Sequence, residues 1–208
     1  MSDTSKQLKS LKLIGGVLCL DFANTDDLLN DYADLLTWAE RAEAVVKSQA
    51  DRLRQAADSA KDQARTAFDR ALALRKAIRR TFSSQAQEDP LGAGDLALLS
   101  TVVGRSAKHL RLQPSPNGVT WEWHDVENQL DWPSWIVARS AADLLVSDRR
   151  DHVRECASND CNWLFIDTSR NHSRRWCDMA NCGNRAKARR SYARKREPVS
   201  RRHNSDAK

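Results

Sequence analysis

The sequence predicts a mainly α-helical protein with a small α+β part. An N-terminal helical domain with one β-hairpin is followed by a compact module that contains two cysteine pairs. Three observations support this fold class: apolar residues recur at helical spacing through much of the first 150 residues, one strand–turn–strand pattern interrupts them, and four of the five cysteines cluster near the C-terminus. We divide the chain into residues 1–150 and 151–208, because the polar run 147–151 offers no apolar residue to a core.

Length and composition exclude several classes of protein. The 208 residues suffice for one core and a small appended module, but not for a multi-domain assembly. Hydrophobic residues make up 40% and charged residues 30% of the chain, and its uncharged apolar stretches, such as 13–20 and 96–104, are far shorter than the ~20 residues that cross a bilayer. Asp21 closes the first stretch where a signal sequence would have small residues. We therefore expect a cytoplasmic protein with no membrane partner.

The first predicted elements are a buried segment and a helix. Residues 11–25 are apolar and end in Asp21, Asn24 and Thr25, residue types that favour caps and turns. These three polar residues form either a buried turn or part of a ligand pocket. Apolar positions then recur at helical spacing over residues 32–47, with Asp31 or Asp34 placed to cap the start.

Residues 51–87 predict a long helix that is broken at most once. The segment contains neither Gly nor Pro, and its apolar positions alternate in steps of four and three. The seam is mostly alanine, which allows close approach of another helix while burying little area. We interpret this helix as scaffold, and it is also the element we nominate for a homodimer if the protein reads paired DNA half-sites.

A loop at 88–94 and a helix over 95–108 lead to the predicted hairpin. Its strands are 109–113 and 119–124, joined by a turn that contains two prolines, an asparagine and a glycine. Pro133 suits the first turn of a further helix that runs to about Ser147. These are the last elements of the predicted N-terminal domain.

Four tryptophans near this hairpin allow two interpretations. Trp121 and Trp123 share one face of a strand, and Trp132 and Trp135 follow closely. Aromatic walls are typical of small-molecule sites, so these residues together with Asp21 and Asn24 form a candidate pocket for a small-molecule effector. The alternative is that the tryptophans supply bulk to a core that is short of Phe and Ile.

Positive charge is concentrated in the C-terminal module. Residues 1–150 carry 20 basic and 21 acidic residues, whereas residues 151–208 carry 14 and 7. Between Arg170 and Arg202 there are 12 basic residues and only two acids, Asp178 and Glu197. This density suits a polyanion, and double-stranded DNA is the leading candidate partner.

The C-terminal cysteines have the spacing of a zinc site. Cys156, Cys161, Cys177 and Cys182 follow the pattern C-x4-C-x15-C-x4-C, in which each pair supplies one edge of a tetrahedral site. Two disulfides or four free thiols are the alternatives, and disulfides favour an oxidising compartment that no targeting signal supports. The spacing therefore predicts one structural Zn²⁺ ion.

The rest of the module predicts a treble-clef-like order of two knuckles, a hairpin and a helix. Residues 162–167 contain a strand, residues 174–177 are its candidate partner, and residues 183–196 form a helix whose N-terminus lies at the last cysteine. The tail beyond is polar, and we expect it to be frayed. Basic residues and one tyrosine on or near this helix are candidates for DNA contact, the alternative being a solvated face: Arg174, Arg175, Arg185, Lys187, Arg189, Arg190, Tyr192, Arg194 and Arg196.

These residues resemble a known family. The run from Glu155 to Arg190, with the sequence Cys-Gly-Asn-Arg at 182–185 and Trp176 before Cys177, is similar to the CGNR zinc finger. The upstream segments LCLDFANT and SAADLL resemble the ABATE domain, which precedes this finger in bacterial proteins regarded as stress-induced transcription regulators. The resemblance implies zinc on the four cysteines, a bacterial cytoplasmic protein, and DNA binding by the finger.

Several side chains of the finger keep two interpretations. Asn184 and Arg185 either support the zinc knuckle through hydrogen bonds or face the partner. His172 could replace a cysteine as a ligand, although four thiolates already complete a tetrahedral set. Arg174 and Arg175 contact phosphate, or one of them pairs with Asp167.

We compare three classes of function. The first is a DNA-binding transcription regulator whose N-terminal domain is a sensor or dimeriser, and the second is a small-molecule-binding domain with a structural or protein-interaction finger. The third, an enzyme such as an HNH-type nuclease, requires several histidines around the metal site, and only His172 lies between the cysteine pairs. No phosphate-binding loop or nucleophile motif occurs elsewhere, so we expect no enzymatic activity.

Overall fold

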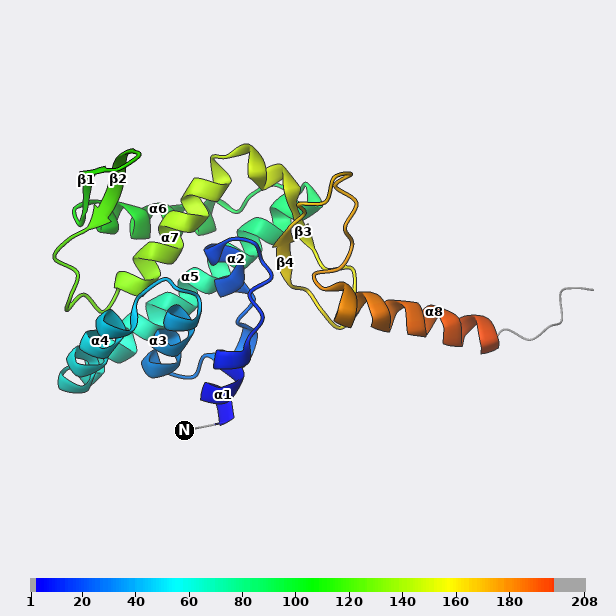
Figure 1. Cartoon of the computed structure of the whole chain (residues 1–208), viewed down its shortest axis with the longest axis horizontal. Helices are drawn as coiled ribbons and strands as arrows, with labels where there is room; N and C mark the ends of the chain where they lie inside the picture. Colours follow the sequence, from blue (N-terminus) through cyan, green and yellow to red (C-terminus); the bar gives the residue numbers. More distant parts are fainter. Residues whose placement is uncertain (1–2, 197–208) are drawn as a thin grey trace, which may run out of the picture.

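The computed structural model describes residues 3–196 and confirms the predicted fold class. Helices dominate, and the two sheets are small antiparallel pairs. A helical body is joined to a smaller cysteine-rich module, from which the last helix projects as a rod (Figure 1). No helix in this part of the chain has both the length and the apolar composition needed to cross a membrane.

The helices of the body include every one predicted, with shifted boundaries, and two more, α1 and α2, that were not predicted as helices. They are α1 (Asp3–Ser10), α2 (Leu18–Ala23), the 3-10 turn η1 (Asp26–Leu28), α3 (Tyr32–Arg41), α4 (Lys47–Ser59), α5 (Lys61–Gln87), α6 (Ala93–Ala107) and α7 (Trp132–Leu145). The predicted helix over 32–47 ends at Arg41, because Glu43 adopts a left-handed conformation with φ of 56°. The Ala44 N–H donates to the Ala39 carbonyl, which closes α3 as a glycine would. The break in the long helix falls at Ala60.

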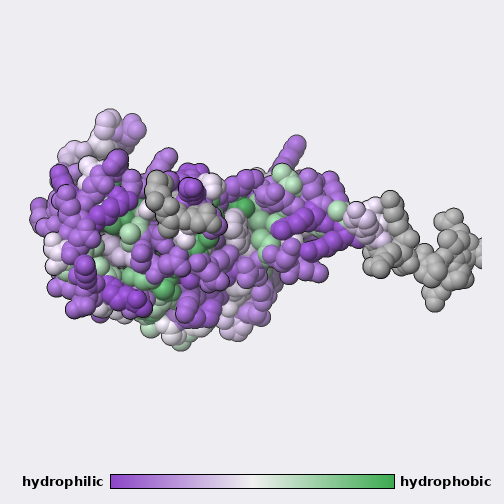
Figure 2. All heavy atoms as spheres, turned by 90° about the horizontal axis from the view of Figure 1, so that it is seen from below, coloured by the Kyte–Doolittle hydropathy of each residue, from purple (hydrophilic) through white to green (hydrophobic). Residues whose placement is uncertain are grey.

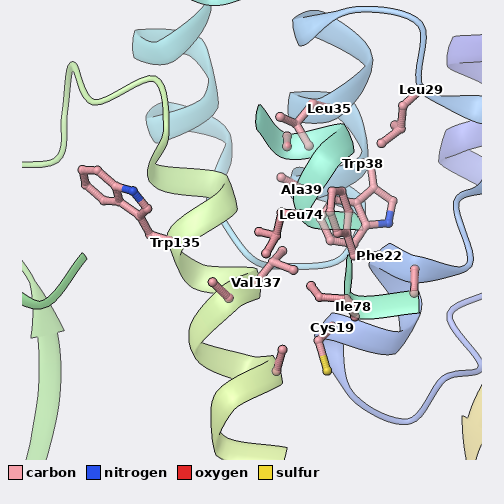
Figure 3. Close-up of a cluster of buried hydrophobic side chains, with 14 of the residues drawn as sticks. Cys19, Phe22, Leu29, Leu35, Trp38, Ala39, Leu74, Ile78, Trp135 and Val137 are labelled. Atoms are coloured by element: carbon pink, nitrogen blue, oxygen red, sulfur yellow. The ribbon is translucent and has the colours of Figure 1, made fainter. Parts of the chain in front are cut away.

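The alanine seam of α5 is buried inside the body. Ala64, Ala67 and Ala71 pack in the main core together with Leu74 and Ile78. Figure 3 shows Leu74 and Ile78 close to side chains from α2, α3 and α7. The seam therefore packs helices of one chain against each other, and it is not exposed for contact with a second copy.

The core has an aromatic centre where α2 meets α3. Phe22 and Trp38 are both fully buried, with their ring centroids 4.8 Å apart, and Figure 3 shows them against Leu74 and Ile78. Offset contacts of this kind stabilise a core beyond the area they bury. The buried segment predicted over 11–25 is confirmed in part: Cys19 to Thr25 are buried, whereas residues 11–14 and 16–18 are half-buried or exposed.

The predicted hairpin is confirmed. Strands β1 (Leu110–Ser115) and β2 (Gly118–Trp123) pair antiparallel around a two-residue loop, and Gly118 has a φ of 119° that favours glycine. The hairpin lies beside α6 and α7 and stands out from them (Figure 1).

The cysteine-rich module contains a second antiparallel pair. After the 3-10 turn η2 (Asp148–His152), strand β3 (Val153–Glu155) pairs with β4 (Leu164–Ile166), and Val153 lies opposite Ile166. The strand expected over 162–167 is therefore present, but its partner precedes the first cysteine. Residues 174–177 are irregular, and a backbone–backbone hydrogen bond from Ala157 N–H to the Arg175 carbonyl joins them to the first cysteine pair.

The strands of the module join the core of the body. Val153, Leu164 and Ile166 are buried in the same apolar cluster as α2 and α5, whereas Phe165, on the opposite face, packs with the cysteines. The division at residues 150 and 151 stays a prediction. The structure shows that apolar packing is continuous across it.

Candidate metal centre

Four cysteine sulfurs converge at one point of the module. The Sγ atoms of Cys156, Cys161, Cys177 and Cys182 all lie within 4.8 Å of one another. The Sγ atom of Cys177 is 3.6 Å from the sulfurs of both Cys161 and Cys182. A tetrahedral zinc ion with Zn–S bonds of about 2.3 Å places its sulfurs about 3.8 Å apart, whereas a disulfide needs about 2.05 Å. The cysteines are free thiols, and they form a site for a single structural Zn²⁺.

The β3–β4 hairpin positions the first cysteine pair. Cys156 follows β3, and its N–H donates to the Trp163 carbonyl at 2.9 Å. A tight turn then brings Cys161 back, with its N–H donating to the Ser158 carbonyl at 3.0 Å. The Cys177 N–H donates to the Cys156 sulfur at 3.4 Å, so the second pair is joined to the first through a ligand atom. Bonds of this kind hold thiolate ligands in place.

The second cysteine pair, Cys177 and Cys182, is brought together by the π-helical turn η3 (Met179–Gly183), which leads directly into α8 (Asn184–Arg196). Asp178 caps this turn by accepting from the Ala180 N–H at 2.8 Å. A Cβ atom on Gly183 would lie 2.8 Å from the Met179 sulfur, so a side chain at this position requires Met179 to move. The glycine of the Cys-Gly-Asn-Arg run therefore lets the turn close beneath the last ligand.

The electrostatics of the site favour a bound cation. Burial, together with the neighbouring thiols, raises the pKa of Cys161 to about 11 and that of Cys177 well above the usual range. Four thiolates therefore cannot share this space without a positive charge, and Zn²⁺ bound to thiols deprotonates them. Burial also acts to raise the pKa of Cys182, but hydrogen bonds from Arg185 and the neighbouring thiols lower it below the usual value.

Asn184 and Arg185 support the knuckle. The Asn184 side-chain amide donates to the Ala180 carbonyl at 3.1 Å, and the Arg185 guanidinium donates to the Cys182 sulfur at 3.2 Å. Arg185 also pairs with Asp160 at 3.3 Å. Of the two interpretations that the sequence allowed, the contacts correspond to hydrogen bonding around the metal site.

Arg174 holds the chain around the second pair. Its guanidinium donates to the backbone carbonyls of Trp176 and Cys177 and lies 4.5 Å above the Phe165 ring. Its backbone N–H, and not its side chain, is bonded to Asp167. The adjacent Arg175 is exposed and lies over the Trp176 ring.

His172 lies apart from the sulfurs. Its ring stacks on that of His152 with centroids 3.9 Å apart, and its Nδ1 is 3.1 Å from the Asp167 carbonyl oxygen. The described residues that could hold a metal are the four cysteines alone.

Helix α8 carries the basic residues away from the zinc site. Arg189 pairs with Asp160 at 3.1 Å, whereas Lys187 is exposed and Tyr192 is 69% exposed. The side chains of three further candidates, Arg190, Arg194 and Arg196, lie outside the described part of the structure. Asp160 was not among the residues predicted for the site, and it contacts two of the arginines that were.

The module is fixed to the body by polar contacts, of which the pair between Asn24 and Leu164 is buried. The Asn24 side chain donates to the Leu164 carbonyl and accepts from the Leu164 N–H, both at 2.8 Å, so that it pairs with β4 as a neighbouring strand would. Nearby, the Trp163 indole N–H donates to Asp26 at 2.8 Å, and Arg79 donates to the Asn162 carbonyl at 2.7 Å. The orientation of the finger is therefore set by the body.

Asp21 lies beneath this junction. Its carboxylate accepts from the Gly15 N–H at 2.8 Å, while the Gly15 carbonyl accepts from the Ile166 N–H. Burial raises the pKa of Asp21 to about 6, although its backbone hydrogen bonds act in the opposite direction. Thr25 is also buried and donates to the Phe22 carbonyl. All three polar residues of this segment thus form structural bonds.

The six residues of the candidate pocket lie in separate places. Asp21 and Asn24 are buried against the zinc module, as described above. Trp132 and Trp135 are buried at the start of α7, where Trp135 stacks on His109 at 4.7 Å. Trp123 is half-buried at the base of the hairpin, and Trp121 is 52% exposed. The structure therefore does not assemble them around one cavity.

A cleft of about 630 Å³ instead lies between the body and the zinc module. Leu11, Ile14 and Leu28 line one side, and Cys161, Trp163 and Arg185 line the other. An ion pair of 2.7 Å joins Lys12 and Asp178, which also line the cleft. Figure 2 shows hydrophobic residues gathered between the body and the projecting helix. The contacts that form the cleft join distant segments, so no spacing in the sequence could have indicated it.

Comparison with known families identifies both parts of the chain. Residues 152–195 match the family model of the CGNR zinc finger. Residues 16–148, more than half of the chain, match the ABATE family model, whose description is "putative stress-induced transcription regulator". A search of the curated proteins found no match.

Proposed function

The chain belongs to the ABATE family, and from this premise we propose that it is a zinc-dependent transcription regulator that binds double-stranded DNA through helix α8. One observation carries the proposal: α8 leaves the zinc knuckle as a projecting rod (Figure 1), and its sequence contains seven basic residues and no acidic one. A basic helix of this kind suits the phosphate backbone and the major groove of a duplex. In this role the protein acts in the cytoplasm of a bacterium, in a response to stress.

The zinc site would act as the anchor of this helix. Zn²⁺ bound to the four cysteines ties the N-terminus of α8 to the β3–β4 hairpin, which is packed into the body. The body thereby fixes the direction in which the guanidinium groups project. Because Arg174 and Arg185 are occupied at the knuckle, we assign phosphate contact to the residues beyond them on α8 and to the exposed Arg175.

Salt dependence and charge reversal test the proposal. If α8 neutralises about five phosphates, the slope of log K against log salt should be about −4 to −5. The double variant Arg189→Glu/Arg190→Glu should weaken the binding of labelled duplex DNA, measured by fluorescence anisotropy. The control variant Arg52→Glu/Arg105→Glu makes the same change of charge at exposed positions of the body and should bind nearly as the wild type does. Absence of binding by the zinc-loaded protein, or equal loss in both variants, contradicts the proposal.

The cleft between the body and the zinc module supports a second role, the binding of a small-molecule effector. Its volume lies in the range of ligand sites, and its walls combine apolar and charged side chains. A metabolite that raises the unfolding temperature of the wild type but not of Leu11→Trp, which would fill the cleft, is the expected result. Val146→Trp, at an exposed site after α7, is the control. Equal stabilisation of all three proteins would place the ligand elsewhere.

We propose no catalytic reaction for the chain. His172 stacks on His152 and is bonded to a backbone carbonyl, an arrangement that supports a structural role. Incubation of plasmid DNA with the zinc-loaded protein and added Mg²⁺ should leave the DNA intact. Cleavage that is lost in His172→Ala would overturn this assignment.

A further inference from the structure

The β1–β2 hairpin has one apolar face that remains exposed. Leu112 lies opposite Trp121 and Pro114 opposite Val119, and cross-strand partners share a face of the sheet. The side chains of Leu112, Trp121 and Val119 are 61%, 52% and 68% exposed. The opposite face is polar and consists of Arg111, Gln113, Ser115, Thr120 and Glu122.

The hairpin has little support from the rest of the body. Trp123 at its base packs against the main core, and the Arg139 guanidinium lies 5.4 Å from the Trp121 ring. Beyond these contacts the hairpin projects from the helices (Figure 1). A two-stranded sheet with one exposed apolar face is marginally stable in water and gains stability from a further strand.

The two edges of the hairpin differ in their free backbone groups. With a two-residue loop, Ser115 and Gly118 form the first hydrogen-bonded pair, and the bond from His124 N–H to the His109 carbonyl fits the same alternation. The backbone groups of the alternate residues therefore point outward. On the β1 edge one of these is Pro114, which has no N–H. The outward residues of β2 are Val119, Trp121 and Trp123, and each keeps its donor. In the part of the chain that is described, neither edge is paired with a third strand.

We propose that the β2 edge is the interface between two copies of this chain. The two β2 strands would pair antiparallel across a two-fold axis at Trp121, giving a four-stranded sheet with β1 at both outer edges. Antiparallel pairing of identical strands is self-complementary, as a two-fold interface requires. The proposal does not depend on DNA binding.

The side chains fit this pairing. Val119 would lie opposite the partner's Trp123, so the apolar faces of both hairpins form one surface. Glu122 would lie opposite the partner's Thr120, so like charges do not meet. Arg111 and Glu122 are cross-strand neighbours within each hairpin, and the polar face of each copy thus carries one charge of each sign. The outward residues of β2 carry no charge and the polar face carries one charge of each sign, which favours a second copy over a strongly charged partner.

Sedimentation velocity of the full-length, zinc-loaded protein over a wide range of concentration tests the interface. The wild type should show a reversible monomer–dimer equilibrium. Val119→Pro removes one outward N–H without removing a bond within the hairpin, and should weaken the dimer about tenfold or more, the usual effect of losing a hydrogen-bond donor at an interface. Val119→Thr keeps the N–H and a similar shape, and should weaken it much less.

A second pair of variants tests the apolar face. Val119→Lys should abolish the dimer, whereas Val146→Lys places the same charge at a site that is 81% exposed outside the hairpin and should leave it intact. Hydrogen exchange gives a readout without mutation, because the Val119 and Trp121 amides should gain protection as concentration rises. A wild type that stays monomeric, including one whose hairpin binds a different protein, overturns the proposal. A dimer that survives both Val119→Pro and Val119→Lys also overturns it.

Discussion

The helical body and the zinc module reach a stable fold by different means. The body buries aliphatic and aromatic side chains around α5, with Phe22 and Trp38 at the centre. The described part of the module has a small apolar cluster of its own, around Phe165 and the cysteines. Its stability depends on the metal ion and on strands β3 and β4, whose apolar side chains pack in the core of the body. The comparison shows that the module is held at two ends: zinc fixes α8 to the hairpin, and Leu164 and Ile166 fix the hairpin to the body.

Removal of zinc should produce the largest difference in stability between the body and the module. Structural zinc in small modules contributes on the order of 10 kcal/mol of folding free energy, so chelation should unfold the segment around the cysteines together with the start of α8. The helices of the body should persist, at a lower unfolding temperature because β3 and β4 pack in their core. Far-UV circular dichroism measures the helix content and the unfolding temperature, and a zinc-sensitive dye measures the release of the metal. Loss of the entire helical signal on chelation would show that body and module are one cooperative unit.

Asn24→Ala should have the second-largest effect, because it removes the buried hydrogen bonds that join the body to the zinc module. The substitution leaves the N–H and the carbonyl of Leu164 without their partner, and each unsatisfied buried group costs about 1–3 kcal/mol. Chemical denaturation should therefore show that the free energy of unfolding falls by about 2–6 kcal/mol. Zinc content should remain stoichiometric, since no ligand is touched. Asn30→Ala is a matched control near the surface of the body. An equally large loss of stability in that variant would show that the hydrogen bonds from Asn24 to Leu164 contribute nothing particular to the fold.

The protonation of Asp21 should make the stability of the contact between body and module depend on pH. Its pKa is about 6 in the folded chain, against a usual value of 3.8, so between these values the folded state binds more protons than the unfolded state. Its favourable contribution is thus fully present below about pH 4 and is lost as the pH rises through 6. A shift of two units corresponds to about 2.7 kcal/mol.

The measurement compares Asp21→Asn with the wild type at several pH values. The amide oxygen can still accept from the Gly15 N–H, so the variant should gain stability relative to the wild type between pH 4 and 7. Comparing the two proteins cancels the pH dependence of zinc binding, which both share. A difference that stays constant with pH would show that Asp21 does not titrate in this range.

Asp160→Asn should have the smallest effect on folding and a distinct effect on binding. Asp160 pairs with both Arg185 and Arg189 at the surface, and exposed ion pairs contribute little to stability. Removing its charge frees positive potential on α8, so affinity for duplex DNA should rise severalfold, with an unchanged unfolding temperature. Asp151→Asn is a control outside these pairs. Equal affinity of Asp160→Asn and the wild type would show that this carboxylate does not compete with phosphate.

Local patterns predicted most of the elements. Helical spacing located α3 and α6, Pro133 marked the start of α7, and the turn residues located the β1–β2 hairpin. The predictions failed where a residue adopted a conformation that its type rarely favours: Glu43 ends α3 in a left-handed conformation that is typical of glycine. Strand β3 was missed because three residues, Val153 to Glu155, are too few to show a period. The alanine seam was correctly read as scaffold, and its burial removes it as a dimer surface.

The metal site could be predicted because the spacing of the cysteines along the sequence is enough to identify its ligands. Two cysteine pairs bring four sulfurs together almost regardless of what lies around them, and the clustering of the four Sγ atoms confirms this. The supporting contacts could not be predicted. Asp160 is 25 and 29 residues from its two arginines, and nothing in the composition of α8 indicates which of its cations are already paired.

The sequence by itself determined the helical class, the zinc ligands, and the charge carried by the last helix, because each depends on neighbours a few positions apart. Only the tertiary structure decided that Asn24 would bind Leu164 across 140 residues, that a cleft would open beside the zinc site, and that the tryptophans would separate into core and surface. These features arise where elements distant in the chain pack together. The free energy of such contacts depends on shape and on burial, which no period in a sequence records.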